Sequence, residues 1–450
     1  MDLRRVIFFQ PRTQARANYS NGDGREQTWT PWFAPLLSPA AKAVGLDVEL
    51  IDARIDDDWR VRVGELLPGD LLACSVMTGA AIRDSMDASS TARANGASVV
   101  WGGPHPTLFP TQTLDQAPVD AIVTGFGFRG FQALISHLMH GPSDLLMATG
   151  YRLKTSTSPR HLDRDRVAPR PPHVLQATDP DPDLSIVRDW GKYVNSDEAI
   201  ADRTVNFVTS EGCLRRCTFC SEPQTSGGAW YQRSIERSVS TIADMVERAQ
   251  ATGLKLHDPN FFDDIPRALA FGKLLHDSTS LPWAASLHPA DLIAMSDPEL
   301  AAASDAGLRR VLVGLETPVP ALIKIAGKKY DPMKINSMAA RLRDNGIRGM
   351  FTFIVGWPGA PATHYDETIA AAHSIHETWP QHQCKIHFLE PWPGTPLFRH
   401  LERQGFKYPQ TLEEWADIDY YSAQYSSLHD KRYTSIIRDA NAVLSPYVNA

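Results

Sequence analysis

The sequence predicts an α/β protein in which a doubly wound, Rossmann-like unit is followed by a partial (β/α)6 barrel. Three observations predict it. Short apolar runs alternate with helical stretches in the first third of the chain, a proline-rich segment interrupts them, and the alternation resumes near residue 204. Strands that alternate with helices pair in parallel through right-handed crossovers. A chain of 450 residues has room for two or three such domains.

The composition excludes several classes of protein. The 45 Lys and Arg residues face 52 Asp and Glu residues, which gives a net charge of −7, and 43% of the residues are hydrophobic. Disorder needs fewer apolar residues, and nucleic-acid binding normally needs a basic surplus. No apolar run approaches the roughly 20 residues of a membrane helix, and the N-terminal run is too short for a signal peptide. We therefore expect a cytoplasmic protein that binds neither nucleic acid nor membrane.

The first unit is expected over residues 1–145. Apolar runs predict strands over 5–9, 47–52, 71–76, 97–101 and 120–123, and helices over 35–44, 81–95 and 131–140. Ligands of doubly wound sheets bind outside the carboxyl ends of the strands. Those ends hold Ser75 and Thr78, then Gly102 and Gly103, and finally residues 125–128.

A linker and a barrel are expected next. Residues 146–199 contain prolines at positions 159, 169, 171, 172, 180 and 182, which lack amide donors and fix φ, so we expect an extended linker. The barrel is expected over 200–400, with strands near 204–209, 254–257, 283–287, 310–314, 349–355 and 385–389. Six units make it partial, because eight do not fit. The C-terminal segment, 401–450, either caps the barrel or lines its pocket.

Three cysteines stand close together directly after the first predicted barrel strand. Cys213, Cys217 and Cys220 have CxxxCxxC spacing, whereas Cys74 and Cys384 are expected to be plain buried residues. Three thiolates can hold three irons of a [4Fe–4S] cluster and leave the fourth iron open for the amino and carboxylate groups of S-adenosylmethionine. A structural zinc site is the alternative, but zinc favours two separated pairs of ligands and no second pair is present.

These motifs resemble the radical SAM superfamily, in particular its branch with an N-terminal cobalamin-binding-type domain. The resemblance covers nearly the whole chain and includes the runs at 101–107 and 391–397. It implies that Cys213, Cys217 and Cys220 ligate the cluster. It also implies contacts with S-adenosylmethionine from Phe219 (adenine), Asp258 and Asn260 (methionine end), Ser286, Glu316 (ribose hydroxyls) and Gly356 (adenine side, through the backbone). The alternatives are core packing for Phe219, a surface ion pair for Glu316 and a simple turn at Gly356.

Whether the first unit holds cobalamin depends on its last loop. If it does, the resemblance places the nucleotide tail at Ser75, Thr78, Gly102 and Gly103. No DxHxxG motif is present, and where relatives usually have Gly-Glu-Gly-Glu this chain has Gly125-Phe126-Gly127-Phe128. The two rings could fill the tail pocket, stack on a ligand or pack in the core. The sequence therefore favours an empty first unit, with cobalamin as the alternative.

The expected reaction depends on whether the first unit binds cobalamin, and two reactions are possible. An empty unit favours radical 1,2-diol dehydration of an aminoglycoside sugar, a reaction known in the superfamily, and a bound cobalamin favours C-methylation of a small natural product. Dehydration needs an acid and a base, for which the candidates are Glu390, His288 and Asp258, with His257 and His387 beside them. The negative net charge suits a polycationic aminoglycoside. We expect a small polar natural-product substrate and an electron donor such as flavodoxin or ferredoxin, and leave a homodimer open.

Overall fold

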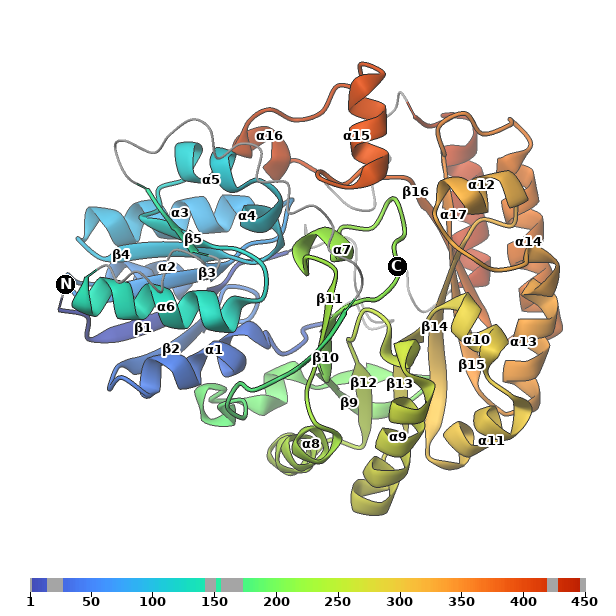
Figure 1. Cartoon of the computed structure of the whole chain (residues 1–450), viewed down its shortest axis with the longest axis horizontal. Helices are drawn as coiled ribbons and strands as arrows, with labels where there is room; N and C mark the ends of the chain where they lie inside the picture. Colours follow the sequence, from blue (N-terminus) through green and yellow to red (C-terminus); the bar gives the residue numbers. More distant parts are fainter. Residues whose placement is uncertain (1, 14–26, 142–150, 155–172, 419–427, 446–450) are drawn as a thin grey trace.

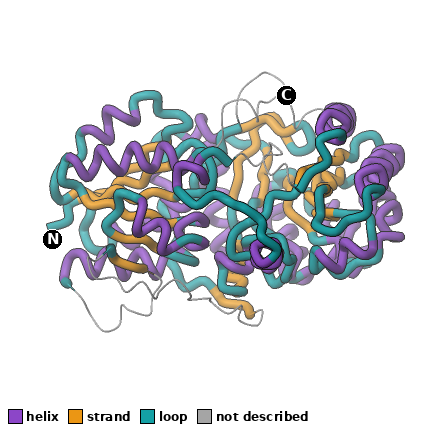
Figure 2. The backbone as a smooth tube through the Cα atoms, turned by 90° about the horizontal axis from the view of Figure 1, so that it is seen from above, coloured by secondary structure: helices purple, strands orange, loops and turns teal. Residues whose placement is uncertain are grey.

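Two α/β units lie side by side, with a small sheet between them (Figure 1). The computed structural model describes residues 2–13, 27–141, 151–154, 173–418 and 428–445. Seen from above, the strands of the two units form separate groups, each flanked by helices (Figure 2). The predicted class, a doubly wound unit followed by a partial barrel, is confirmed.

The first unit is a six-stranded sheet of order β2-β1-β3-β4-β5-β6. Its parallel strands are β1 (Arg5–Gln10), β2 (Asp47–Asp52), β3 (Asp70–Ser75), β4 (Ser98–Gly102) and β5 (Ala121–Val123). All five were predicted from their apolar runs, which reflect burial of both faces of a parallel sheet. A short antiparallel strand, β6 (Tyr151–Leu153), pairs with β5 and was not predicted. A run of three residues is too short to show a period.

Helices cover both faces of this sheet. They are α1 (Phe33–Lys42), α2 (Trp59–Gly64), α3 (Ala81–Ala94), α4 (Pro104–Leu108), α5 (Pro110–Gln116) and α6 (Gly127–His140). Side chains of β1 alternate between two core clusters, with Val6 and Phe8 in one and Ile7 and Phe9 in the other. The last helix begins at Gly127, earlier than the predicted start at residue 131, because tertiary contacts outweigh the low helix propensity of its two glycines.

The second unit is a seven-stranded sheet of order β16-β15-β14-β13-β12-β9-β8. Its six parallel strands are those predicted: β9 (Ala201–Phe207), β12 (Gly253–Leu256), β13 (Trp283–Leu287), β14 (Leu308–Glu316), β15 (Arg348–Val355) and β16 (Gln383–Phe388). Strand β8 (Asn195–Asp197) adds an antiparallel edge. The connecting helices are α8 (Ile235–Ala249), α9 (Ile265–Thr279), α10 (Pro289–Ala294), α11 (Asp297–Asp305), α12 (Pro320–Ile325), α13 (Ile335–Asp344) and α14 (His364–Thr378).

The inner face of the barrel sheet is partly open. In β15, Phe351 and Phe353 are buried, whereas Thr352 and Ile354 between them are half-buried. Successive side chains of a strand point to opposite faces, so the buried set faces the helices and the other set faces the interior. Leu312, in the middle of β14, is 38% exposed. An exposed side chain at the centre of a sheet marks an interior that is not filled by the protein's own core.

The predicted linker, residues 146–199, takes part in all three sheets. It supplies β6 to the first sheet, β8 to the barrel, and β7 (His173–Gln176) to the small sheet of order β10-β11-β7. Short 3-10 helices at Leu184–Ile186 and Trp190–Tyr193 bury Trp190 and Tyr193 in the core. Apolar side chains of this segment therefore pack into the core, which an extended linker would not do. The predicted prolines 159, 169, 171 and 172 lie outside the described residues.

The C-terminal segment packs on both units. Helix α15 (Pro396–Arg403) and α16 (Leu412–Ala416) lie between the tops of the two units, and Leu412 and Trp415 enter the core of the first one (Figure 1). Helix α17 (Tyr433–Leu444) packs on β16, where the Asn441 amide donates to Ile386 O (2.9 Å) and accepts from Ile386 N (2.8 Å). A free sheet edge invites unwanted strand pairing. Asn441 therefore covers the edge of the barrel, in agreement with the capping alternative.

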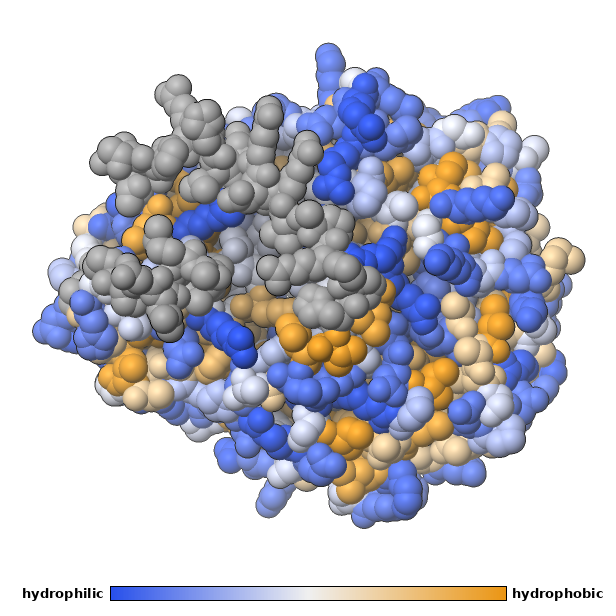
Figure 3. All heavy atoms as spheres, viewed as in Figure 1, coloured by the Kyte–Doolittle hydropathy of each residue, from blue (hydrophilic) through white to orange (hydrophobic). Residues whose placement is uncertain are grey.

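The visible surface is mixed in polarity. On the face shown in Figure 3, hydrophilic side chains surround small hydrophobic groups. The exposed apolar residues are scattered, as for Val61 (65%) and Met333 (88%), which is ordinary for a folded surface. None of the described helices has the length and apolar content needed to span a bilayer.

Candidate functional site

The three cysteines lie on a loop whose middle is anchored by backbone hydrogen bonds. The loop follows β10 (Ser210–Gly212) and leads through α7 (Glu222–Thr225) to β11 (Ala229–Gln232), and all three thiols are half-buried. In its middle, Thr218 N donates to Ala326 O (2.9 Å) after α12, and Leu397 N donates to Thr218 O (3.0 Å). These contacts place the loop at the carboxyl end of the barrel strands, where barrel active sites lie.

Burial disfavours the thiolate form of these cysteines. It raises the pKa of Cys220 to about 12 and raises the pKa of Cys213 and Cys217 as well. A thiolate here therefore needs a cation beside it, which the irons of a cluster supply. Among the described residues, no three His, Cys, Asp or Glu side chains converge closely enough to hold a single metal ion. Both the cluster and the zinc alternative would supply such a cation.

A polar network fixes the first half of the cysteine loop. Asp263 accepts from Leu214 N (2.9 Å) and from Arg215 Nε (3.1 Å), and Arg215 also pairs with Asp291. The Asn260 amide donates to Asp263 (2.8 Å) and Asp291 (2.9 Å). Its oxygen accepts from the backbone N–H of His288 (3.0 Å). Asn260, predicted to contact the methionine end, thus binds strand ends β12 and β13 to the loop.

Asp258 is fully engaged by the neighbouring strand. It is 1% exposed, and its carboxylate accepts hydrogen bonds from Thr209 N (3.0 Å), Thr209 Oγ1 (2.7 Å) and Ser210 Oγ (2.5 Å). Desolvation raises the pKa of Asp258, and these donors oppose the shift. Contacts of this kind count against Asp258 as a catalytic acid or base and indicate that it fixes the start of the cysteine hairpin.

We expect Asp258→Ala to lower the free energy of unfolding by about 3 kcal/mol, because buried donors on Thr209 and Ser210 would lose their acceptor. Urea unfolding measures it. The matched control is Asp277→Ala on the exposed face of α9, where loss of the ion pair with Lys273 should cost less than about 1 kcal/mol. Full stability combined with lost turnover in Asp258→Ala would instead make Asp258 a reacting group.

Glu316 is held at the end of β14 in an uncommon backbone conformation. Its φ is +65°, next to an irregularity in the pairing of β14 with β15. Its carboxylate is 2.9 Å from Nζ of Lys328, and both side chains are buried. Non-glycine residues in this region cost energy and cluster at functional sites. Glu316 therefore does form an ion pair, but this pair lies at a buried strand end and not on the surface.

The residues predicted on the adenine side lie together. The Phe219 ring packs edge-on against Trp357, with centroids 5.5 Å apart. Gly356 has φ +84°, and a Cβ there would collide with the His429 ring from the C-terminal segment. Gly356 N also donates to His364 Nε2 (3.0 Å). The glycine is therefore required by close packing, and Phe219 has a packing role whatever else it contacts.

His288 has a local structural role. Its Nδ1 accepts from Ala290 N (3.1 Å) and so caps α10, and burial lowers its pKa to about 2. A neutral ring that already caps a helix is poorly suited to act as the acid. Ser286, two residues earlier on β13, is half-buried and faces the interior. Glu390 is 9% exposed and follows β16.

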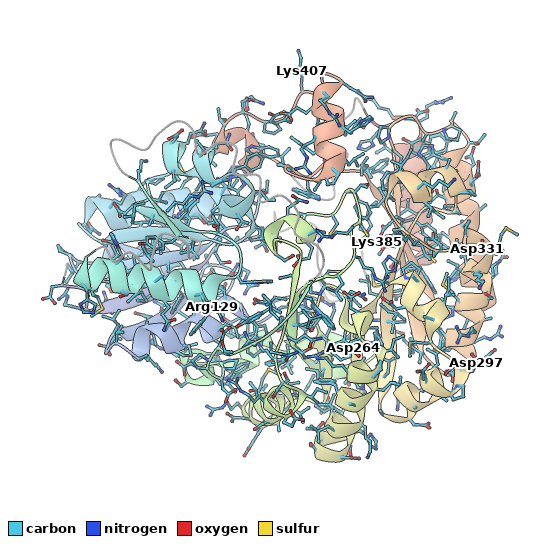
Figure 4. The ribbon with its side chains drawn as sticks, viewed as in Figure 1. Arg129, Asp264, Asp297, Asp331, Lys385 and Lys407 are labelled. Carbon is cyan, nitrogen blue, oxygen red and sulfur yellow. The ribbon has the colours of Figure 1, made fainter. Side chains whose placement is uncertain are left out.

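Basic side chains line much of the interior face. Lys255 on β12 lies over the Trp29 ring (4.8 Å), and His257 contacts the same ring edge-on (5.2 Å). Lys385 and His387 occupy alternate positions of β16, and Figure 4 shows Lys385 on the side facing the middle of the molecule, whereas Asp297 and Asp331 lie on the outer rim. Burial lowers the pKa of both lysines to about 8. Lysines tuned in this way can transfer protons near neutral pH.

The depressed pKa of Lys255 predicts a pH-dependent stability. Its folded value, about 8, lies below the ordinary 10.5, so the unfolded chain binds more protons between these values and Lys255 makes stability rise with pH there. We expect Lys255→Met to be more stable than the wild type at pH 7 and to lose this advantage by about pH 10.5. Urea unfolding at both pH values measures it. Lys273→Met, on exposed α9, should show no such trend, and a constant difference for Lys255→Met would contradict the assignment.

A cavity of about 610 Å³ lies at the carboxyl edge of the first sheet. Ser75, Gly102 and Gly103 line it on one side, and Glu211, Tyr231 and Arg233 of the small sheet line it on the other. Arg129, at the start of α6, faces it across the gap between the units (Figure 4). The cavity thus joins the first unit to the hairpin that carries the cysteines.

The last loop of the first unit forms a wall of this cavity without filling it. The Phe126 ring stacks on Tyr231, with centroids 5.4 Å apart and an interplanar angle of 29°. Phe128 also lines the cavity. Thr78 does not: its buried hydroxyl bonds His105 Nδ1 (3.0 Å). The space, its aromatic walls and the glycines fit the planar base in the nucleotide tail of cobalamin, but Thr78 is not available to bind that tail.

Sequence reasoning missed several residues of these sites. Three examples are Lys328, Tyr231 and His429. Each comes from a segment remote from the motif it touches, and none lies at a predicted strand end. A buried lysine has no local signature, so its role could be found only from the tertiary contacts.

Comparisons with known proteins agree with this architecture. Residues 207–372 match the family model of the radical SAM superfamily. An uncharacterized methyltransferase of Pyrococcus horikoshii is 24% identical over 349 residues, 75% of this chain and 72% of the relative. An anaerobic magnesium-protoporphyrin IX monomethyl ester cyclase of Rubrivivax gelatinosus is 26% identical over 424 residues, 88% and 70% of the two chains. The cytidylyl-2-hydroxyethylphosphonate methyltransferase of Streptomyces wedmorensis is 24% identical over 337 residues, 69% and 62%.

Solved structures share the fold over most of the chain. The radical S-adenosylmethionine methyltransferase TsrM from Kitasatospora setae superposes with a TM-score of 0.69 at 18% identity, covering 89% of this chain and 76% of TsrM. The cobalamin-dependent S-adenosylmethionine radical enzyme OxsB superposes with a TM-score of 0.66 at 13% identity, covering 90% and 61%. Residues 207–372, which include the cysteine loop, are thus similar to the radical SAM superfamily, and the two-unit fold is shared with TsrM and OxsB.

Proposed function

We propose that this enzyme acts on a small polar molecule held inside the barrel, with a [4Fe–4S] cluster bound by Cys213, Cys217 and Cys220. The observation that carries the proposal is the position of the cysteine loop. The loop lies at the carboxyl ends of the barrel strands, where the strained, ion-paired Glu316 also lies. When bound, the reduced cluster supplies the electron that splits S-adenosylmethionine into methionine and a 5′-deoxyadenosyl radical. A one-electron donor of the flavodoxin or ferredoxin class would feed the cluster.

The chain's own residues then bind S-adenosylmethionine and the substrate and orient them. Glu316 offers carboxylate oxygen to the ribose hydroxyls, and the Phe219–Trp357 pair forms an apolar wall for the adenine. Asn260 and Asp258 keep the loop and strands in register rather than contact the ligand. The interior face, with half-buried Ser286 and Thr352 and exposed Leu312, provides the space for the substrate.

We infer that the outcome is a cobalamin-dependent methyl transfer to carbon. The cavity of about 610 Å³ beside Ser75, Gly102 and Gly103 supports a cofactor in the first unit. Two of the curated relatives are named as methyltransferases, and TsrM is a methyltransferase with a structure that holds cobalamin. When bound, cobalamin supplies the methyl carrier that this outcome needs. This reverses the preference for an empty first unit that the Phe126 loop suggested.

Radical 1,2-diol dehydration is the second candidate, and two lysines on the interior face of the barrel favour it. Loss of water from a diol radical needs a group that gives a proton, and Lys255 and Lys385 have the depressed pKa values that suit this task. Glu390 and His387 lie at the end of the same strand as Lys385. The lysines argue against an amine of an aminoglycoside beside them, so a hydroxyl-bearing or anionic part of the substrate fits this face better.

One experiment separates the two outcomes. The reconstituted enzyme is incubated anaerobically with S-adenosylmethionine, reductant and a sugar 1,2-diol that carries no amine, with and without hydroxocobalamin. Methyl transfer predicts a product 14 mass units heavier, dependent on cobalamin, together with S-adenosylhomocysteine. Dehydration predicts a product 18 mass units lighter without cobalamin. If neither 5′-deoxyadenosine nor S-adenosylhomocysteine forms, both outcomes are wrong.

A further inference from the structure

Lys328 is a buried cation with two partners at the end of β14. Its Nζ lies 2.9 Å from Oε1 of Glu316 and also donates to the carbonyl of Gly314. The side chain is 5% exposed. A charge this deeply buried is tolerated only when it is paired and hydrogen-bonded. The ammonium is therefore fixed in place by the strand end and, in turn, fixes one oxygen of the Glu316 carboxylate.

The turn that carries Lys328 also touches the cysteine loop. Ala326 O accepts from Thr218 N (2.9 Å), and Thr218 Oγ1 donates to Ile325 O (2.5 Å). Gly327 has φ +70°, and a Cβ there would lie 3.0 Å from Arg216 O. Only glycine fits this close approach without strain. Three consecutive residues, 326–328, thus contact the cysteine loop on one side and Glu316 on the other.

The end of β14 has a glycine, Gly314, that leaves room for this ion pair. A Cβ on Gly314 would collide with Glu316 Oε1 and lie 3.0 Å from Lys328 Nζ. The φ of Glu316 is +65°, and the Tyr330 hydroxyl oxygen lies within hydrogen-bond distance of the carbonyl oxygens of Leu315 (2.9 Å) and Thr317 (2.7 Å) on either side, to one of which it donates its single proton. The backbone strain at Glu316 is therefore held by contacts that all come from the segment after α12.

We infer that Lys328 is a positioning residue that couples the cluster loop to the carboxylate that binds S-adenosylmethionine. Its ammonium holds Oε1 of Glu316 and leaves Oε2 to face other partners. The same turn keeps Thr218, between Cys217 and Cys220, at a fixed distance from that carboxylate. This inference rests on the proposed function, because it concerns how the same site binds S-adenosylmethionine.

The test compares Lys328→Met with Lys328→Arg in the cluster-loaded enzyme. We expect Lys328→Met to weaken S-adenosylmethionine binding by about 10- to 100-fold, the range for residues that orient a ligand-binding group. KM should rise more than kcat falls, while iron content stays unchanged. The change in the EPR signal of the reduced cluster on adding S-adenosylmethionine should be reduced, and Lys328→Arg should restore much of it. Lys324→Met, which replaces an exposed lysine on the preceding helix α12, is the matched control.

A double variant keeps the test decisive if Lys328→Met folds poorly. Glu316→Gln with Lys328→Met removes both charges, so no unpaired charge stays buried. Its affinity for S-adenosylmethionine should equal that of Glu316→Gln alone, because Lys328 acts through Glu316. Additive losses, or wild-type affinity in Lys328→Met, would overturn the inference. Loss of iron in parallel with affinity would make Lys328 merely structural. A wild-type enzyme that releases no 5′-deoxyadenosine would instead overturn the proposed function.

Discussion

Alanine at Cys213, Cys217 or Cys220 is expected to abolish release of 5′-deoxyadenosine. Each thiol lies on the loop between β10 and β11, and burial raises the pKa of all three, so none is a thiolate unless a cation holds it. Removing one ligand leaves a two-thiol site. Even the loss of residues that only orient a metal ligand costs 10- to 100-fold, so we expect a loss of more than about 100-fold for each variant, measured as nucleoside release per enzyme.

The matched controls are the two other cysteines. Cys74 on β3 and Cys384 on β16 are fully buried in the cores of the two units. Cys74→Ala and Cys384→Ala should lower stability modestly through the lost volume but keep the iron content and nucleoside release. Undiminished release in the Cys213, Cys217 and Cys220 variants would remove the cluster from the proposed site. Equal losses in all five variants would indicate general unfolding instead.

Gly102→Leu is expected to eliminate retained cobalamin and methylated product while leaving radical formation intact. Gly102 lines the cavity of the first unit, and a Cβ there would meet only Val123 at 3.7 Å and 3.8 Å, which are ordinary contacts. The remaining leucine atoms must then occupy the cavity. We expect corrin absorbance after desalting to fall more than tenfold, because an overlapping side chain competes with the ligand for the same volume. Release of 5′-deoxyadenosine should change little.

The exposed Gly64 provides the control for this variant. A Cβ on Gly64, at the end of α2, meets nothing within 4 Å, so Gly64→Leu adds the same side chain away from the cavity. It should retain corrin as the wild type does. If Gly102→Leu also retains corrin, cobalamin binds elsewhere. If the wild type retains none and still forms a dehydrated product, the second candidate reaction replaces methyl transfer.

The barrel strands were predictable because they carry a local signal. A strand such as β15 buries every second residue against the helices, and that period is visible in the sequence without knowledge of its neighbours. The short strands β6 and β7 carry no such period. They exist because β5 and β11, remote in the sequence, offer them free edges. Such pairing depends on the assembled sheets and could not be predicted from local sequence.

The positions of the candidate residues at strand ends were predictable from the sequence, whereas their contacts were not. Asp258, Asn260 and His288 all lie at carboxyl ends of barrel strands, as their positions in the sequence indicated. Their polar atoms, however, hold Thr209 and Ser210, Asp263 and Asp291, and Ala290. A polar residue after a strand has the same appearance in the sequence whether it binds a ligand or braces a loop. Only its hydrogen-bond partners distinguish the two.

By itself, the sequence determined the two α/β units and the CxxxCxxC loop, because strand periodicity and ligand spacing are set by residues close together in the chain. Only the tertiary structure decided that Lys328 pairs with Glu316, that a cavity remains open between Gly102 and Tyr231, and that Asn441 covers the edge of β16. Each of these depends on side chains from separate elements meeting at short range. Burial then makes such contacts strong, because a polar group removed from water must find its partner within the protein.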